Sequence, residues 1–127
     1  MNTAGLFFDA TATPFVPIDF SDKPAYPGYV WQAILEKCAT IEEAVKFINT
    51  CKVPDLQRIH VSLADKTGNS VIIGAYDGQL TYHYRKNQSY QLLTNFNLTN
   101  PEYGNEPVCE RFQRASALLQ KDSATTV

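Results

Sequence analysis

The chain has 127 residues and a net charge of −2 at neutral pH, a length that suits one domain with a substantial core rather than two. Its 44% hydrophobic and 19% charged residues exclude a disordered chain. No basic stripe is present, so we expect no nucleic-acid partner. No apolar run approaches the roughly 20 residues that a membrane helix needs. Because no basic residue precedes the GLFF stretch, we see no signal peptide and expect a cytoplasmic protein.

The cysteines are Cys38, Cys51 and Cys109. They are widely spaced, odd in number and form no CxxC pair, which favours reduced thiols over disulfides or a zinc site. The chain contains no glycine-rich nucleotide loop, no HExxH and no GxSxG motif. We therefore expect neither a metal nor a cofactor.

The first half of the chain predicts a strand, a long loop and two helices. The apolar run at 4–10 predicts a short buried strand. Four prolines and a glycine at 13–28 predict an irregular loop, because proline removes a hydrogen-bond donor and fixes φ. Apolar residues then recur at helical spacing over 29–38 and again over 40–51. The second helix begins with a threonine followed three residues later by a glutamate, a capping box.

From Gln57 onward the apolar period changes to two, which is typical of strands. Ile59, Val61 and Leu63 fall on one face of the first strand, and His60 falls on the other. Turn signals separate four predicted antiparallel strands, at 57–65, 70–76, 79–84 and 89–96. Helical spacing returns at 107–120, and we expect 121–127 to be a frayed tail.

This order of elements predicts an α+β fold, in which helices cover one face of a mostly antiparallel sheet. We find no internal repeat and no domain boundary. We therefore predict that residues 1–127 form a single domain.

Few side chains stand out as candidates for chemistry. His60 and His83 lie within predicted strands, and the sequence shows no nucleophile beside either. Asp65 ends a strand and is expected to cap the following turn. Asp9 follows an apolar strand and either faces a cleft or has a structural role. Asn95 ends a strand, where an amide either bonds the next turn or donates to a developing oxyanion.

Five segments in the same order resemble the linear amide C–N hydrolases. These are N-terminal-nucleophile enzymes that include choloylglycine (bile salt) hydrolase and penicillin V acylase. The hairpin IHVSLADKTGNSVII is similar to the family pattern H-x-x-x-x-D-x-x-G-x-S-x-V-x-E, and LLTNFNLTNPE is similar to VLTN followed by Phe or Ser and then Pro. The other three segments are MNTAGLFFDA, ATIEEAVKFINTCKV and PVCERFQRASALL.

The resemblance implies a four-layer αββα sandwich, of which this chain would form a part. It also implies that Asn95 is the asparagine that helps to form the oxyanion hole. Thr94, Phe96 and Asp9 would then lie near a bound ligand. The implied ligand is a small amide or acyl compound.

This sequence also departs from the family pattern at several positions. The family's catalytic cysteine, with an arginine and an aspartate, aligns upstream of Met1. A second site asparagine aligns with Ala12, and the glutamate that closes the hairpin pattern aligns with Gly74. Without nucleophile and base, we expect this chain not to hydrolyse amides on its own.

Two alternatives remain for the function. One is a fragment or truncated member of the amide hydrolase family. The other is a non-catalytic ligand-binding or oligomerising module on the same scaffold. In both cases the missing layers would leave a sheet face or edge exposed, so we expect a homo-oligomer or a companion chain.

Overall fold

The computed structural model describes residues 1–98 and 109–125. The fold is α+β, as the sequence predicts. Its elements are, in chain order, β1 (Phe7–Ala12), α1 (Val30–Lys37), α2 (Ile41–Ile48), the short 3₁₀ helix η1 (Pro54–Gln57), β2 (Ile59–Ala64), β3 (Ser70–Tyr76), β4 (Gln79–Tyr84) and α3 (Glu110–Thr125).

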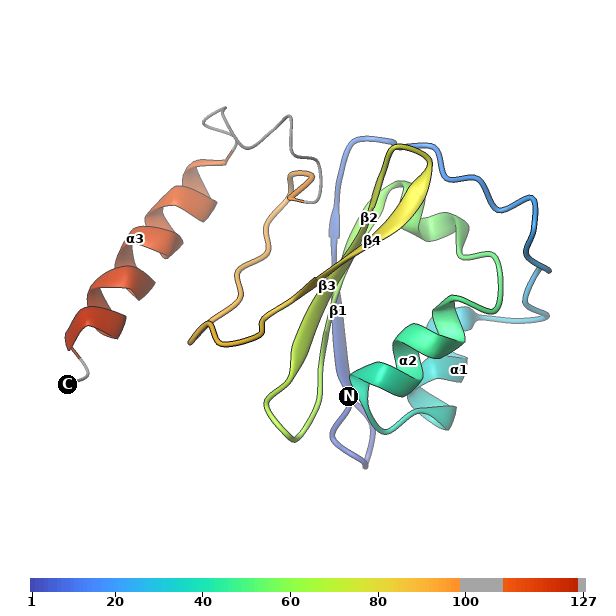
Figure 1. Ribbon diagram of the computed structural model, residues 1–127, viewed down its shortest axis with the longest axis horizontal. Coiled ribbons are helices and arrows are strands. Elements are labelled where there is room, and N and C mark those ends of the chain that lie inside the picture. Colours follow the sequence, from blue (N-terminus) through green and yellow to red (C-terminus); the bar gives the residue numbers. More distant parts are fainter. Residues whose placement is uncertain (99–108, 126–127) are drawn as a thin grey trace.

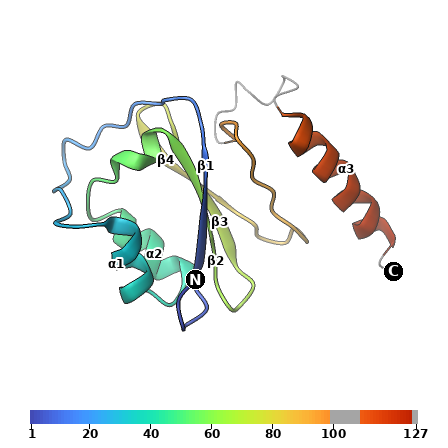
Figure 2. The ribbon, with the colours of Figure 1, turned by 180° about the vertical axis from the view of Figure 1, so that it is seen from behind.

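The strands form one antiparallel sheet in the order β1-β2-β3-β4. The helices α1 and α2 lie on one side of this sheet and α3 lies on the other, as two opposite views show (Figures 1 and 2). The prediction that helices cover one face is therefore confirmed for α1 and α2.

The core lies between the sheet and these two helices. Val61 and Leu63 of β2 and Val71 and Ile73 of β3 are fully buried, as the period-two pattern predicts. They pack with the buried residues of the helices, including Ile34 of α1. Burying each such side chain contributes about 1.5–3 kcal/mol, so this layer holds the sheet and the helices together.

Helix α2 begins where its capping signals predict. The Glu43 backbone N–H donates to Thr40 Oγ1 at 3.2 Å, and Glu43 Oε2 accepts from the Ala39 N–H. The Ile41 N–H donates to Asp65 Oδ2 at 3.1 Å. Asp65 therefore caps its own turn, through Thr67, and also binds the first residue of a helix 24 positions away.

The first strand begins later than the sequence predicts. Residues 2–6 form a turn, in which the Leu6 N–H donates to Asn2 Oδ1 at 2.9 Å and Gly5 has a φ of 92°. The Asn2 amide also donates to the carbonyls of Leu35 and Cys38, next to α1. These bonds hold the turn, so β1 starts at Phe7 and not at residue 4.

The predicted strand at 89–96 is wrong. This segment is irregular, and β1 supplies the fourth strand of the sheet instead. The physical reason is that side-chain contacts hold this segment against the sheet in place of a backbone ladder. The Gln91 side chain donates at 2.6 Å to the carbonyl of His83, whose backbone already pairs with Ile72 of β3.

The segment that follows Gln91 crosses the second face of the sheet. His60 and Ile72, which point to this face, are both only 1% exposed. Both faces of the sheet centre are therefore covered, one by helices and the other by residues that include Phe96 and Asn97, which are themselves buried.

The last helix runs from Glu110 to Thr125, into the stretch expected to be a frayed tail. The first two residues of the predicted helix, 107 and 108, lie outside the described residues. The loop at 13–28 is irregular, as predicted, apart from isolated bridges at Ile18 and Ala25.

Candidate functional site

The turn that carries Asn95 is attached to the end of β1. Thr11 Oγ1 donates to the Thr94 carbonyl at 3.1 Å, and Asn95 Nδ2 donates to the Ala12 carbonyl at 3.2 Å. These bonds join residues 83 positions apart in the chain. The antiparallel sheet brings the end of β1 to this turn, so the position of Asn95 depends on the fold rather than on local sequence.

The side chain of Asn95 is exposed and bonded at both ends. Arg111 Nη2, from the first turn of α3, donates to Asn95 Oδ1 at 2.9 Å. An amide nitrogen carries two N–H groups, and the bond to Ala12 uses one of them. Among the described residues, the second N–H of Asn95 has no partner and is a donor at the surface, close to the Arg111 guanidinium group.

Phe96 anchors the same turn. Its side chain is 9% exposed and meets Phe112 of α3 edge to face, with ring centroids 4.9 Å apart. Aromatic pairs in this geometry contribute about 0.5–1.5 kcal/mol beyond their buried area. Phe96 thus joins the turn to α3 and has a packing role, while Thr94 is half-buried next to it.

Cys109 lies immediately before α3, and its carbonyl accepts the first bond of the helix, from Gln113. The nearby Thr94 hydroxyl and the Phe112 backbone N–H lower the pKa of the Cys109 thiol to about 7. Backbone N–H groups at a helix start stabilise a thiolate in this way. The other two cysteines are buried, and burial raises the pKa of both Cys38 and Cys51.

Asp9 lies apart from this turn. It is exposed on β1, where its Oδ1 accepts from the Ala10 N–H at 2.8 Å. It shares a sheet face with Thr11, two residues further along. No hydrogen bond joins Asp9 to Asn95 within 1–98 and 109–125, so the structure does not bring these two predicted site residues together.

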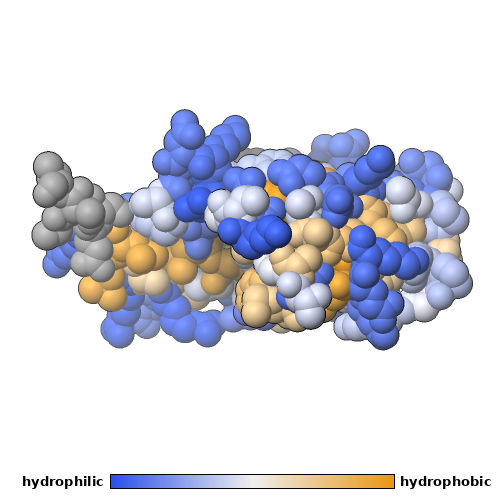
Figure 3. All heavy atoms as spheres, turned by 90° about the horizontal axis from the view of Figure 1, so that it is seen from below, coloured by the Kyte–Doolittle hydropathy of each residue, from blue (hydrophilic) through white to orange (hydrophobic). Residues whose placement is uncertain are grey.

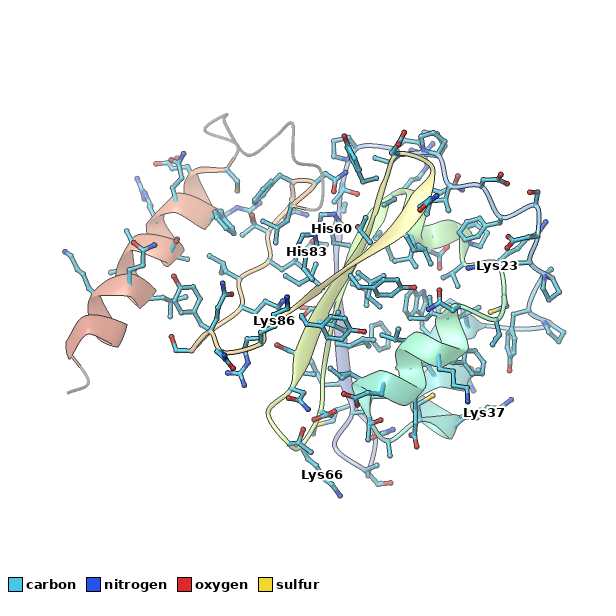
Figure 4. All side chains as sticks on the ribbon, viewed as in Figure 1. Lys23, Lys37, His60, Lys66, His83 and Lys86 are labelled. Carbon is cyan, nitrogen blue, oxygen red and sulfur yellow. The ribbon has the colours of Figure 1, made fainter. Side chains whose placement is uncertain are left out.

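Sequence reasoning missed Asn97. Its side chain is 3% exposed, its Oδ1 lies 2.8 Å from His60 Nε2, and its Nδ2 donates to the Ala75 carbonyl at 3.1 Å. Figure 4 shows His60 and His83 on the side of the sheet that faces this segment. Since His60 is 37 residues from Asn97, no local pattern could have paired them.

A cavity of about 570 Å³ lies between the sheet, the segment at 88–92 and α3. Neither Asn95 nor Asp9 lines it. Its walls include Ile72, His83, Gln91, Leu92, Leu98 and Phe112. The cavity therefore adjoins the turn through Phe112 and Leu98, and not through the Asn95 amide.

The described part of the chain has neither a metal-binding cluster nor a membrane-spanning helix. Residues 1–98 and 109–125 contain no cluster of three or more histidine, cysteine, aspartate or glutamate side chains arranged to hold a metal ion. In those same ranges, no helix has the length and apolar character needed to cross a membrane.

Comparison with known proteins identifies the family. The model of the acyl-coenzyme A:6-aminopenicillanic acid acyl-transferase family matches residues 1–125. The chain therefore belongs to this family, which agrees with the resemblance to N-terminal-nucleophile amide hydrolases.

Two relatives carry the same name. A penicillin V acylase from Pectobacterium atrosepticum is 38% identical in an alignment of 84 residues that covers 58% of this chain and 22% of the relative. The structure of a penicillin V acylase from Agrobacterium tumefaciens superposes with a TM-score of 0.58 at 28% identity, covering 78% of this chain and 32% of that chain. The chain thus spans about a fifth to a third of these relatives, and it shares the N-terminal-nucleophile hydrolase fold with the solved one.

Proposed function

We propose that this chain forms the part of an amide hydrolase site that holds a carbonyl group, with Asn95 as the hydrogen-bond donor. The observation that carries the proposal is the arrangement of the Asn95 amide, exposed at the end of β1 and bonded to Arg111. Membership of a family whose relatives include penicillin V acylases supports it. The ligand is a small amide or acyl compound.

The chemistry follows from the charge of the turn. An amide N–H that points at the oxygen of a tetrahedral intermediate stabilises the negative charge, and loss of one such donor costs about 2.7–4 kcal/mol in a complete site. Arg111 and the start of α3 add positive charge next to Asn95. Both features favour an anionic oxygen over a neutral one at this position.

We further propose that residues 1–127 do not hydrolyse amides by themselves. The thiols of Cys38 and Cys51 are buried in the core, where their raised pKa keeps them protonated. Cys109 is more acidic, but an internal cysteine has no α-amino group to act as the base of the family's mechanism. Nucleophile and base would come from a companion chain or from a segment outside these residues.

Exposed apolar side chains support association with such a partner or with a second copy. Phe7 is 43% exposed, Tyr84 is 41% exposed and Leu118 is 64% exposed. Orange surface extends along the side of the molecule that carries α3 (Figure 3). Covering apolar surface contributes about 25 cal/mol per Å², so a partner that buries this side is favoured.

The alternative is a non-catalytic module that binds a ligand or forms oligomers on the same scaffold. The cavity beside α3 favours it, because a volume of about 570 Å³ lies within the range of small-molecule sites. In that case the ligand would contact Gln91 and Phe112 rather than Asn95.

Ligand binding and turnover separate these proposals. Binding of penicillin V is measured by calorimetry for the unmodified chain, for Asn95→Ala and for Asn87→Ala, whose asparagine is also exposed but lies in another turn. Loss of binding in Asn95→Ala alone supports the first proposal. Loss on substitution of Gln91, with Asn95→Ala unaffected, supports the alternative. Turnover of penicillin V by the chain alone, surviving replacement of all three cysteines, would contradict the proposed lack of hydrolysis.

A further inference from the structure

We infer that His60 and Asn97 form a buried latch, which holds the Asn95 turn on the sheet while the His60 ring is neutral and releases it when the ring is protonated. His60 is thus a positioning residue. The inference rests on the proposed function only in the role given to Asn95 as a carbonyl-binding residue. The latch itself depends on contacts within residues 1–98.

The hydrogen bonds determine which nitrogen of His60 carries the proton. Asn97 Nδ2 donates to the Ala75 carbonyl, so Asn97 Oδ1 is the atom that faces His60. An amide oxygen only accepts, and Nε2 of the neutral ring must therefore be the donor. The opposite orientation of the amide would set Oδ1 against the Ala75 carbonyl, where neither atom can donate.

The other ring nitrogen opposes protonation. His60 Nδ1 is buried and has no hydrogen-bond partner within the described residues. Adding a proton there would create both a buried charge and a donor without an acceptor, each of which is unfavourable. Burial accordingly lowers the pKa of His60, although the Asn97 hydrogen bond acts in the opposite direction and nearby His83 lowers it further.

The latch is closely connected to the Asn95 turn. Asn97 is two residues from Asn95, and the backbone between them is tightly turned. The Phe96 N–H donates to the Thr94 carbonyl and the Leu98 N–H donates to the Phe96 carbonyl, both at 2.9 Å. A shift of Asn97 would therefore move the Asn95 side chain relative to β1 and Arg111.

Within residues 1–98 and 109–125, few other groups on this face can titrate or carry charge. β1 presents Asp9, whose pairing partner on β2 is Ser62, next but one to His60. β4 presents His83, opposite Ile72. Arg111 of α3 and Cys109, which precedes this helix, lie near the turn. His83 and Cys109 are the groups that most need to be separated from His60, because the charge of His83 acts on His60 and the pKa of Cys109 is about 7.

The sign of the pH dependence follows from the lowered pKa of His60. While the turn is held on the sheet, the pKa of His60 lies below its ordinary value of 6.5. His60 therefore stabilises this arrangement fully when the pH is above 6.5. The contribution is lost as the pH falls below this value and through the lowered one. The turn should therefore be held at neutral pH and loosen in weak acid.

Hydrogen exchange measured by NMR tests the latch without any ligand or activity. Protection factors of the Phe96 and Leu98 amides are compared at about pH 7.5 and about pH 5, a range that spans ordinary histidine titration. We expect these protection factors to fall about tenfold at the lower pH, which is the factor expected for the loss of one buried hydrogen bond. Amides inside α2, such as that of Ile48, should keep their protection.

Four variants make the test specific. Asn97→Ala and His60→Leu should lose the protection at both pH values. His60→Gln, which keeps a donor and cannot titrate, should retain protection at neutral pH and lose its pH dependence. His83→Gln is the matched control and should keep the pH dependence of the unmodified chain. If His60→Leu does not fold, Asn97→Ala and the unmodified chain decide the question.

Two results would overturn the inference. One is protection at Phe96 and Leu98 that does not change with pH in the unmodified chain. The other is a pH effect that persists in His60→Gln, because another group would then be responsible. Neither result concerns the role of Asn95. If Asn95→Ala did not alter ligand binding, that result would contradict the proposed function but not the latch.

Discussion

Arg111 and Asn95 are joined by a 2.9 Å hydrogen bond from guanidinium to amide oxygen, between the first turn of α3 and the turn that follows residue 94. Together with the bond from Asn95 to the Ala12 carbonyl, it makes this one side chain a bridge between β1 and α3. The amide is consequently oriented before any ligand arrives, which is the condition for effective electrostatic stabilisation.

Replacing Asn95 by alanine should have only a small effect on stability. The side chain is exposed, so the two lost hydrogen bonds are replaced by bonds to water, and we expect a decrease of about 1 kcal/mol in the free energy of unfolding. Urea unfolding of Asn95→Ala beside Asn87→Ala measures it. A decrease several times larger would mean that Asn95 is chiefly a structural residue.

Cys109 should be the most reactive thiol of the chain. With a pKa of about 7, a large part of it is thiolate at neutral pH, whereas the pKa values of Cys38 and Cys51 are raised. Iodoacetamide followed by peptide mass spectrometry should label Cys109 first, with a rate that rises as the pH passes through about 7. Equal labelling of all three cysteines would be inconsistent with this description.

Removing the Asp65 carboxylate should destabilise the fold. Burial raises the pKa of Asp65, but hydrogen bonds from Thr67, Ile41 and Asn69 outweigh this effect and leave the pKa lowered. Because hydrogen bonds to charged groups contribute about 1.5–3 kcal/mol, Asp65→Ala should lower the free energy of unfolding by about that amount. Thermal and urea unfolding provide the measurement.

The same residue predicts an acid dependence. Since its pKa is lower in the folded state, the contribution of Asp65 is complete above its ordinary value of 3.8 and is lost as the pH falls below it. The stability difference between the unmodified chain and Asp65→Asn should therefore shrink in acid. A difference that stays constant down to about pH 2, well below the pKa of an unperturbed aspartate, would contradict this assignment.

The exposed apolar side chains predict self-association when no companion chain is present. We expect light scattering to show a dimer or larger species at micromolar concentration, because apolar surface at Phe7 and Leu118 is then removed from water. Leu118→Glu should shift the equilibrium toward the monomer, and Gln113→Glu, an exposed position on the same helix, is the matched control. A stable monomer of the unmodified chain would argue against an interface here.

The sequence predicts those elements in which one periodic pattern governs packing. Val61 and Leu63 alternate with His60 and Ser62, and they are buried against the helices. Thr40 and Glu43 mark the start of α2 because a cap is a local interaction. The fold class and the antiparallel hairpins follow from such patterns.

Other features depend on contacts between distant residues. Residues 89–96 have strand-like composition, yet Gln91 contacts β4 through its side chain and not through a backbone ladder. Asn95 stands out by its position, but its partners Ala12 and Arg111 come from other elements. Asn97 gives no signal of its own because its burial depends on His60.

The central claim is that the Asn95 amide binds a carbonyl oxygen, and the side-chain amide resonance of Asn95 tests it most directly. In an NMR titration with penicillin V, the account predicts a saturable shift of this resonance together with the Arg111 guanidinium signal. The Asn87 side-chain amide should not shift. A saturable binding curve reported by residues around Gln91 and Phe112, with the Asn95 and Arg111 signals unchanged, would contradict the claim.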